Sequence, residues 1–203
     1  MTELDLVEQT VEVGGRELSL LRPRDAVALL DEEAFEREEF LPYWAELWAS
    51  GETLAREVAG RQVGGLRVLE LGCGLALPSL AAALGGAEVL ATDWSPDAIA
   101  LLETNAARNG IRLETKVVAW SQADVLVARA PWDLVLAADV LYERRNVDEL
   151  LALLPQLEPT EVLVADPGRP HAQTFFERAT PTWDFKWREP VTSLRPRAAS
   201  ARG

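Results

Sequence analysis

The sequence predicts an α/β fold: a doubly wound, mostly parallel sheet preceded by an N-terminal β-hairpin and a helical extension. From residue 66 onward, short apolar runs alternate with segments of helical periodicity, as in repeated βαβ units. Residues 7–20 instead alternate polar and apolar side chains around a Gly-Gly pair, which is typical of a hairpin. We therefore expect an extension over 1–60, a core over 61–195 and a frayed tail over 196–203.

The hairpin is predicted by VEQTVEV and RELSL, the two runs that flank the Gly-Gly pair. Glycine supplies the positive φ that a two-residue turn needs. A turn at this pair places Val13 opposite Arg16, which sets the register of both strands. One face of the hairpin then carries Val7, Val11, Val13, Leu18 and Leu20.

Two helical patterns follow the hairpin. Residues 24–40 have helical periodicity and are strongly acidic. Farther along, Ser50 is a candidate N-cap for a helix that carries Leu54 and Val58 one turn apart and ends near Gly60. We expect this extension to pack on the core.

The core reads as five strands separated by four helices. Pro78 and Pro96 stand where first-turn prolines belong, Ser95 can cap the second helix, and Asn109-Gly110 can end it. Crossovers between parallel strands are right-handed, so a ligand is expected at the carboxyl ends of the strands near the first one. The strands are predicted at 67–71, 88–92, 113–118, 133–138 and 161–165, and the helices near 78–84, 97–109, 146–154 and 171–179.

Composition limits the possible partners. The 203 residues are 48% hydrophobic, and 33 acidic against 20 basic side chains give a formal charge of −13. Such a field repels polyanions, so we expect no nucleic-acid partner. No apolar run approaches a membrane span, the N-terminus does not read as a signal peptide, and a lone cysteine fits a reducing compartment. These features predict a cytoplasmic protein without a membrane partner, and we expect it to act as a monomer.

The stretch LRVLELGCGL at 66–75 carries the most chemical information. Glu70 closes an apolar strand, and Gly72 and Gly74 follow in a turn. A dinucleotide loop would need a third glycine where Leu77 stands, and Glu70 would repel its phosphates. S-adenosylmethionine has no phosphate, and its ammonium and sulfonium are attracted by a carboxylate. The loop therefore predicts this cofactor, with the glycines permitting close backbone approach.

Two further positions fit a nucleoside. Asp93 follows the strand at 88–92, about twenty residues past the glycine loop, where a carboxylate can accept both ribose hydroxyls. Trp94 comes next, and Trp120 ends the third strand, where its indole can lie beside adenine or pack on the sheet. The structural alternatives are that Glu70 supports a turn and that Asp93 caps the following helix.

These motifs carry a family resemblance. They are ELGCG at 70–74, TDW at 92–94, WDLVLAADVLY at 132–142 and VADPGRP at 164–170. Together they resemble the seven-strand, Rossmann-like S-adenosylmethionine-dependent methyltransferases, and most of all the subgroup that includes the lysine methyltransferase of the electron-transfer-flavoprotein β subunit. The segment PYWAELWASGETLA at 42–55 resembles the stretch before the core in that subgroup, which implies that Trp48 lies at the cofactor.

The resemblance implies methyl transfer to a lysine of a protein substrate, with the flavoprotein β subunit as a candidate. Asp139 is expected to contact the cofactor and to orient the amine rather than deprotonate it, because a nearby anion favours the ammonium. An aromatic pocket would remove water and favour the neutral amine. The implied catalytic residues are Asp139 and Tyr142, and the implied substrate contacts are Trp44, Tyr142, Asp166 and Arg169.

Two departures from the subgroup affect these expectations. Ala119 stands where relatives often have an acidic residue near adenine, so one adenine contact is not expected here. The C-terminal REPVTSLRPRAASARG shows no apolar periodicity, so the sequence does not predict a complete closing strand pair.

Three functions remain open at this stage: a protein lysine methyltransferase that meets a basic surface with its acidic segment 31–39, a methyltransferase of a small amine or hydroxyl metabolite, and a non-catalytic S-adenosylmethionine-binding module. His171, the single histidine, is expected at a helix start rather than in catalysis. Cys73 is expected to be a small buried side chain, and no spacing suggests a metal site.

Overall fold

The computed structural model describes residues 4–26, 29, 43–188 and 190–197. These residues form a seven-stranded sheet in the order β5-β4-β3-β6-β7-β9-β8 and a separate two-stranded hairpin. The sheet is parallel except that β9 runs antiparallel to both β7 and β8. The predicted fold class is therefore confirmed. The strands are β1 (Leu6–Val13), β2 (Arg16–Pro23), β3 (Arg67–Leu71), β4 (Glu88–Asp93), β5 (Glu114–Val117), β6 (Leu134–Ala138), β7 (Glu161–Ala165), β8 (Trp183–Arg188) and β9 (Val191–Pro196).

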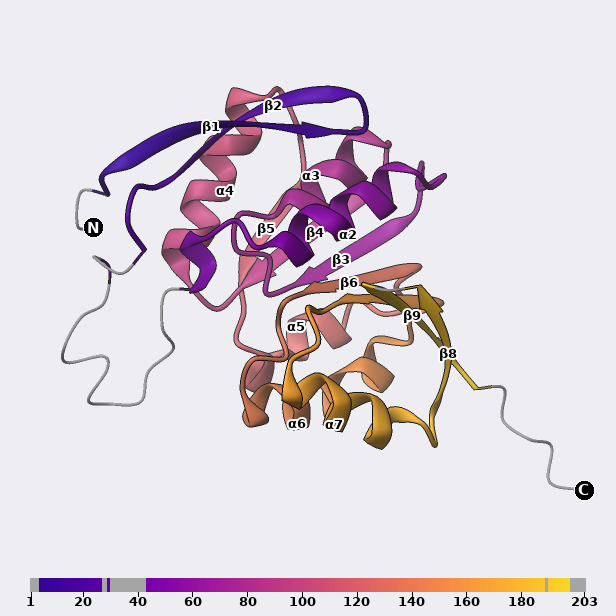
Figure 1. The fold of residues 1–203 in the computed structure, drawn as a ribbon. Helices are drawn as coiled ribbons and strands as arrows, with labels where there is room; N and C mark the ends of the chain where they lie inside the picture. Colours follow the sequence, from indigo (N-terminus) through magenta and orange to yellow (C-terminus); the bar gives the residue numbers. More distant parts are fainter. Residues whose placement is uncertain (1–3, 27–28, 30–42, 189, 198–203) are drawn as a thin grey trace, which may run out of the picture.

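The helices cover both faces of the sheet. In Figure 1 one helical layer and the hairpin lie above the sheet, and a second helical layer lies below it. Two apolar cores result, one on each face. The upper layer is α2 (Ala49–Ala59), α3 (Leu77–Leu84) and α4 (Pro96–Arg108), the lower layer is α5 (Asp124–Val127), α6 (Arg144–Leu153) and α7 (Pro170–Ala179), and the 3-10 turns are η2 (Tyr43–Ala45), η3 (Trp120–Gln122) and η4 (Leu154–Leu157).

The hairpin covers α2 and α4 rather than the sheet itself. Its register is as predicted, with Val13 opposite Arg16, and its apolar face packs into the upper core. The side chain of Asn105 on α4 accepts a hydrogen bond from the Leu21 N–H (2.7 Å) and donates one to the Leu21 carbonyl (2.9 Å). An amide side chain thus satisfies the backbone at the free edge of β2, since amides both donate and accept.

Two predictions about the extension and the end of the chain need correction. Helix α2 begins at Ala49 with Trp48 in the N-cap position, so Ser50 is not the cap and instead lies buried in the first turn. The closing strand pair is present as β8 and β9. The sequence does not show these strands as an alternation of polar and apolar side chains, because Thr192 and Ser193 are polar yet buried between neighbouring strands.

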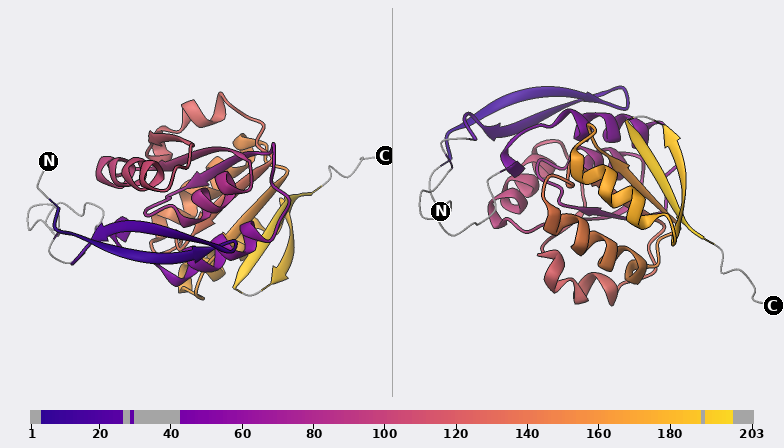
Figure 2. Two further views of the ribbon diagram at one scale, coloured as in Figure 1. Left: turned by 90° about the horizontal axis from the view of Figure 1, so that it is seen from above. Right: turned by 60° about the horizontal axis from the view of Figure 1, so that its bottom comes forward.

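The remaining boundaries agree closely with the sequence. Strand β9 extends to Pro196, and the Arg197 N–H bonds the Thr182 carbonyl (3.0 Å), just past the predicted start of the tail. Most of the predicted acidic helix at 24–40 and residues 198–203 lie outside the described residues. Both views of Figure 2 place β8 and β9 at the edge of the molecule.

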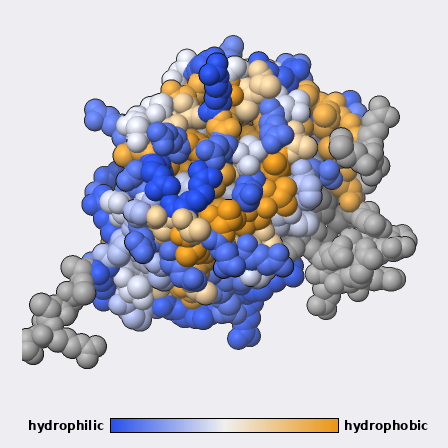
Figure 3. Space-filling model, turned by 180° about the vertical axis from the view of Figure 1, so that it is seen from behind, coloured by the Kyte–Doolittle hydropathy of each residue, from blue (hydrophilic) through white to orange (hydrophobic). Residues whose placement is uncertain are grey.

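The surface combines polar and apolar areas. On the face shown in Figure 3, apolar residues gather near the centre with hydrophilic residues around them. Trp48, Val117 and Trp187 are large apolar side chains that are exposed. Within the described ranges, none of the helices has both the length and the apolar content that crossing a bilayer requires.

Candidate active site

A cavity lies where β3, β4 and β6 end, beneath the segment that leads into α2. Its empty volume, open mouth included, is about 950 Å³, which is in the range of cofactor pockets. The lining contains ten of the twelve side chains and glycines that the sequence suggested for the site. These are Trp44, Trp48, Glu70, Gly72, Gly74, Asp93, Trp94, Trp120, Asp139 and Tyr142.

The two glycines are required by the packing of the protein itself. Both have positive φ, +68° at Gly72 and +51° at Gly74. A Cβ at Gly72 would come within 3.0 Å of Val140 Cγ1, and one at Gly74 within 3.2 Å of the Trp44 carbonyl oxygen. The loop therefore fits against the segment that follows β6 on one side and against η2 on the other, a reason for glycine that adds to the predicted closeness of a ligand.

Glu70 is buried at the floor of the cavity and supports the start of α3. One carboxylate oxygen accepts hydrogen bonds from the Ser79 N–H (2.9 Å) and from the Ser79 hydroxyl. Ala76, in the N-cap position, makes no side-chain cap, so Glu70 satisfies a helix N–H from outside. Burial raises the pKa of Glu70 to about 8, against the lowering effect of the Ser79 bonds. Glu70 therefore supports the start of α3, and its contact with a cofactor stays a prediction.

Asp93 holds the glycine loop against the end of β4. Its Oδ2 accepts from the Gly74 N–H and its Oδ1 from the Ser95 N–H, both at 2.9 Å. Ser95 itself caps α4, as predicted, through a 3.3 Å bond from the Ala98 N–H. Burial raises the pKa of Asp93 despite the N–H bonds to its carboxylate. Because a carboxylate offers about four acceptor positions, acceptor capacity remains for a ligand in the cavity.

At the end of β6, Asp139 is paired with an arginine thirty residues away. Asp139 has a φ of +56°, and its side chain is only 6% exposed. The Arg169 Nε donates to Asp139 Oδ1 at 2.5 Å. The two residues predicted for the site that do not line the cavity, Asp166 and Arg169, therefore lie just behind Asp139.

Asp166 fixes the loop that carries this arginine. Its Oδ1 accepts from the Gly168 N–H (2.8 Å) and the Arg169 N–H (2.7 Å). Its Oδ2 is buried and has no hydrogen-bond partner among the residues that the structure describes. Burial, the largest effect, raises the pKa of Asp166. Asp166 thus forms the turn that carries Arg169, and its predicted contact with substrate stays a prediction.

Aromatic rings form one wall of the cavity near Asp139. The rings of Tyr43 and Tyr142 are 4.8 Å apart, and those of Tyr43 and Trp48 are 6.2 Å apart. The Trp48 Nε1 donates to the Tyr43 carbonyl (2.8 Å). Burial raises the pKa of Tyr142 to about 12, although a bond with Asn146 opposes this. The Tyr142 hydroxyl therefore stays protonated across the physiological pH range.

Comparison with known proteins identifies the family. Residues 43–181 match the family described as lysine methyltransferase. The chain belongs to the lysine methyltransferase family. This confirms the family resemblance that the sequence motifs indicated. The described cavity, with its buried carboxylates, glycine loop and aromatic wall, is the candidate active site of this lysine methyltransferase family member.

Individual relatives agree with this result. The electron transfer flavoprotein β-subunit lysine methyltransferase of Xenopus laevis is 36% identical over 137 residues, which cover 63% of this chain and 53% of that protein. A human histone-arginine methyltransferase is 32% identical over 98 residues, covering 46% of this chain and 52% of that protein. The chain thus spans about half the length of these curated relatives.

A solved structure supports the fold. The 16S rRNA methyltransferase RsmC of T. Thermophilus, in complex with AdoMet and guanosine, superposes with a TM-score of 0.65 at 15% identity. The match covers 95% of this chain and 51% of that one. At this identity the likeness concerns the fold alone.

Sequence reasoning missed three residues of this family member's site: Tyr43, Ser79 and Asn146. Tyr43 lies directly before Trp44 in a motif that was recognised, so its ring was a signal that could have been used. Ser79 and Asn146 act through hydrogen bonds, to Glu70 and to the Val140 carbonyl (2.8 Å) respectively. No sequence pattern marks such partners.

Two other sequence candidates lie where the sequence predicts. Cys73 is buried, and burial raises the pKa of its thiol well above the ordinary value. His171 lies in the first turn of α7 beside a second cavity and does not line the candidate active site. In the part of the chain that the structure describes, no cluster of three or more metal-ligating side chains occurs.

Proposed function

We propose that this protein transfers a methyl group from S-adenosylmethionine to the side-chain amine of a lysine in a protein substrate. The observation that carries the proposal is the pairing of family membership with a cavity that ends at Asp139 among aromatic rings. A lysine side chain is long, apolar along its stem and cationic at its tip. Such a side chain matches an aromatic wall that leads to a carboxylate.

The described residues fit the cofactor. Glu70 and Asp93 are acceptors at the floor of the cavity, suited to an ammonium and to ribose hydroxyls. Trp94 and Trp120 offer aromatic surface for the base, and the backbone of Gly72 and Gly74 permits close approach. When bound, the cofactor would supply a methyl group that its positively charged sulfur activates for transfer to the acceptor nitrogen.

The remaining task of the protein is to prepare the amine. Free lysine has a pKa of about 10.4, so its ammonium must lose a proton to water before its lone pair can react. The rings of Tyr43, Trp48 and Tyr142 attract the ammonium and exclude water around it. Asp139 accepts a hydrogen bond from the amine and orients it, which is the main contribution when geometry limits the rate.

The acceptor is proposed to be a folded protein. One of the relatives is named for the electron transfer flavoprotein β subunit, so that protein from the same source is the first candidate substrate. The acidic segment 31–39 is proposed to meet a basic surface of the substrate. We further propose that the protein acts as a cytoplasmic monomer and takes no nucleic acid as substrate; sizing with light scattering tests the oligomeric state.

The test is transfer of labelled methyl groups. Purified protein is incubated with methyl-labelled S-adenosylmethionine and either lysate from its own source or purified flavoprotein β subunit. Labelled proteins are then separated from labelled metabolites, and the modified residue is located by mass spectrometry. Label on lysine supports the proposal. Label on arginine or only on small compounds contradicts the acceptor class, and no label with intact cofactor binding favours a non-catalytic module.

A further inference from the structure

Arg169 occupies a distinctive place beside the candidate active site. Its Nε donates to Asp139 Oδ1 at 2.5 Å, and its guanidinium carbon lies 5.7 Å from the centre of the Trp48 ring. The backbone N–H of Arg169 is held by Asp166. The guanidinium is thus fixed between the carboxylate that faces the cavity and the aromatic wall.

This placement addresses a conflict in the proposed chemistry. A carboxylate close to lysine favours the charged ammonium, whereas methyl transfer needs the neutral amine. The effect of Asp139 would be strong because its side chain is only 6% exposed, and charges interact more strongly away from water. A carboxylate that only oriented the amine would therefore also slow its deprotonation.

We propose that Arg169 is a positioning residue whose positive charge offsets that of Asp139, so that Asp139 can orient the acceptor amine without holding it as an ammonium. The Asp139–Arg169 pair is formally neutral, and among the described residues its hydrogen bond uses only Oδ1 of Asp139, so the second carboxylate oxygen can accept an N–H. The inference rests on the proposed function. It concerns only the proton that leaves the ammonium for water before methyl transfer.

Other charged groups surround this pair and set the background. Asp166 lies behind Arg169, and its carboxylate, like that of Asp139, raises the pKa of the Arg169 guanidinium. A substitution at Arg169 leaves the other titratable side chains that face the cavity unchanged, so its effect reports the loss of the arginine charge alone. They are Tyr43, Glu46, Glu70, Cys73, Asp93, Tyr142 and Glu149.

The experiment compares Arg169→Gln with Arg169→Lys, using a peptide that contains the lysine found by the labelling experiment. Gln removes the charge but keeps a hydrogen-bond donor, whereas Lys keeps the charge. We expect the pH midpoint of kcat to rise by about one unit or more in Arg169→Gln, with kcat about tenfold lower near pH 7 and restored at high pH. Arg169→Lys keeps the wild-type midpoint.

A binding measurement supplies a readout that does not depend on turnover. Without the arginine charge, the ammonium of the peptide becomes the cation that pairs with Asp139. Calorimetry at pH 7 should therefore find tighter peptide binding to Arg169→Gln than to the wild type. A residue that merely supported the fold would weaken binding and lower kcat together, so the opposite directions of the two effects identify the charge.

The matched control is Arg178→Gln. Arg178 also lies on the α7 segment and pairs with a carboxylate, Asp148, at 2.5 Å, but both side chains are about half exposed and neither lines the cavity. This variant should keep the wild-type pH profile. Should Arg169→Gln fail to fold, Arg169→Met tests the same charge.

Two outcomes would overturn the inference. One is an unchanged pH midpoint in Arg169→Gln, and the other is an equal loss of kcat at every pH. Either result leaves the proposed function standing if the wild type methylates lysine. A wild type that labels no lysine fails earlier, in the labelling experiment, and removes both proposals.

Discussion

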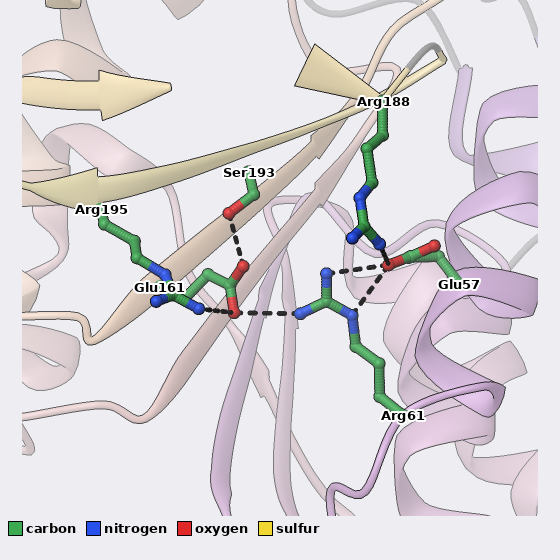
Figure 4. A network of polar contacts seen from close by, with 6 residues as sticks. All are labelled: Glu57, Arg61, Glu161, Arg188, Ser193 and Arg195. Carbon is green, nitrogen blue, oxygen red and sulfur yellow. Dashed lines mark hydrogen bonds and ion pairs between the residues drawn. The ribbon is translucent and has the colours of Figure 1, made fainter. Parts of the chain in front are cut away.

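Two groups of arginines and carboxylates in this protein differ in how fully their charges are paired. Figure 4 shows the first, where the end of α2 meets the outer strands. There Arg61 bonds Glu161 at 3.0 Å and Glu57 at 2.8 Å, and Glu161 also accepts from the Ser193 hydroxyl. In the second group, at the candidate active site, Asp139 pairs with Arg169 and the Oδ2 of Asp166 has no hydrogen-bond partner among the described residues.

The charges of the first group bond one another and stabilise the fold. In the second group, Asp139 faces the cavity, where a ligand can reach it. In the first group the carboxylates lie deeper than the outer arginines: Glu161 is 14% exposed and Arg195 is 68% exposed. Their bonds connect α2, β7 and β9, and they lie away from the cavity. In the second group, Asp139 lines the cavity, whereas the Oδ2 of Asp166 is buried behind it and is not open to a ligand.

The largest expected effect is at Asp139. Asp139→Asn keeps the size of the side chain and tolerates the positive φ, but it removes the negative charge that holds Arg169 and orients the amine. We expect kcat to fall by about 10²-fold or more. Cofactor affinity, measured by calorimetry, should stay near the wild-type value. Equal turnover by wild type and variant would remove Asp139 from the proposed mechanism.

The next effect concerns Glu70 and pH. Its pKa is raised from 4.5 to about 8 in the folded protein, so the folded state binds a proton that the unfolded state has released. Stability should therefore fall as pH rises from about 4.5 to 8, by on the order of a few kcal/mol. Chemical denaturation across this range measures the slope, and Glu70→Gln should flatten it.

Cofactor binding supplies a second test of Glu70. A positively charged ligand beside Glu70 favours the ionised carboxylate, so binding near pH 7 should release a proton. Calorimetry in buffers of different ionisation enthalpy counts this proton, and Glu70→Gln should not release it. An identical proton count for both proteins would mean that Glu70 does not sense the ligand charge.

A smaller effect is expected in the network of Figure 4. Arg61→Met removes the cation that bonds both Glu57 and Glu161, and leaves these half-buried carboxylates less well paired. We expect a loss of about 2 kcal/mol in the free energy of unfolding, with kcat unchanged because the network is remote from the cavity. A marked loss of turnover at unchanged stability would contradict this division of roles.

The smallest effect should come from the outer edge of the same network. Arg195→Met removes a contact of 3.5 Å made by an exposed side chain. Exposed pairs of this kind contribute about 0–1 kcal/mol, so thermal unfolding should change little. A loss of stability as large as that of Arg61→Met would show that the exposure of these arginines does not determine how much they stabilise the fold.

The sequence predicted most of the fold because its signals there are local. The Gly-Gly pair set the hairpin register, and Pro96 with Ser95 marked the start of α4. The closing strands β8 and β9 were not predicted, because Thr192 and Ser193 are buried by residues distant in the chain. The pattern of polar and apolar residues does not reveal such burial. Ser50 was misplaced as a cap because the helix starts two residues earlier than that cap would require, at Ala49.

The candidate site was predictable in its residue types but not in its contacts. The motifs placed Glu70, Asp93 and Asp139 at strand ends, and topology brings those ends together. The partners of these carboxylates come from elsewhere: Ser79 for Glu70, and Arg169, thirty residues on, for Asp139. Such pairs depend on how the helices are set on the sheet, and therefore only the structure gives them.

The close packing of Gly74 against the Trp44 carbonyl limits how far the chain can be shortened at its N-terminal end. The cavity-lining residues from Tyr43 to Gly51 come from the segment before the sheet. This segment packs closely against the glycine loop at Gly74. A chain shortened to begin at β3 would retain every strand of the sheet yet leave the cavity without its cover. In this protein, the segment that precedes the sheet in sequence forms part of the candidate active site in space.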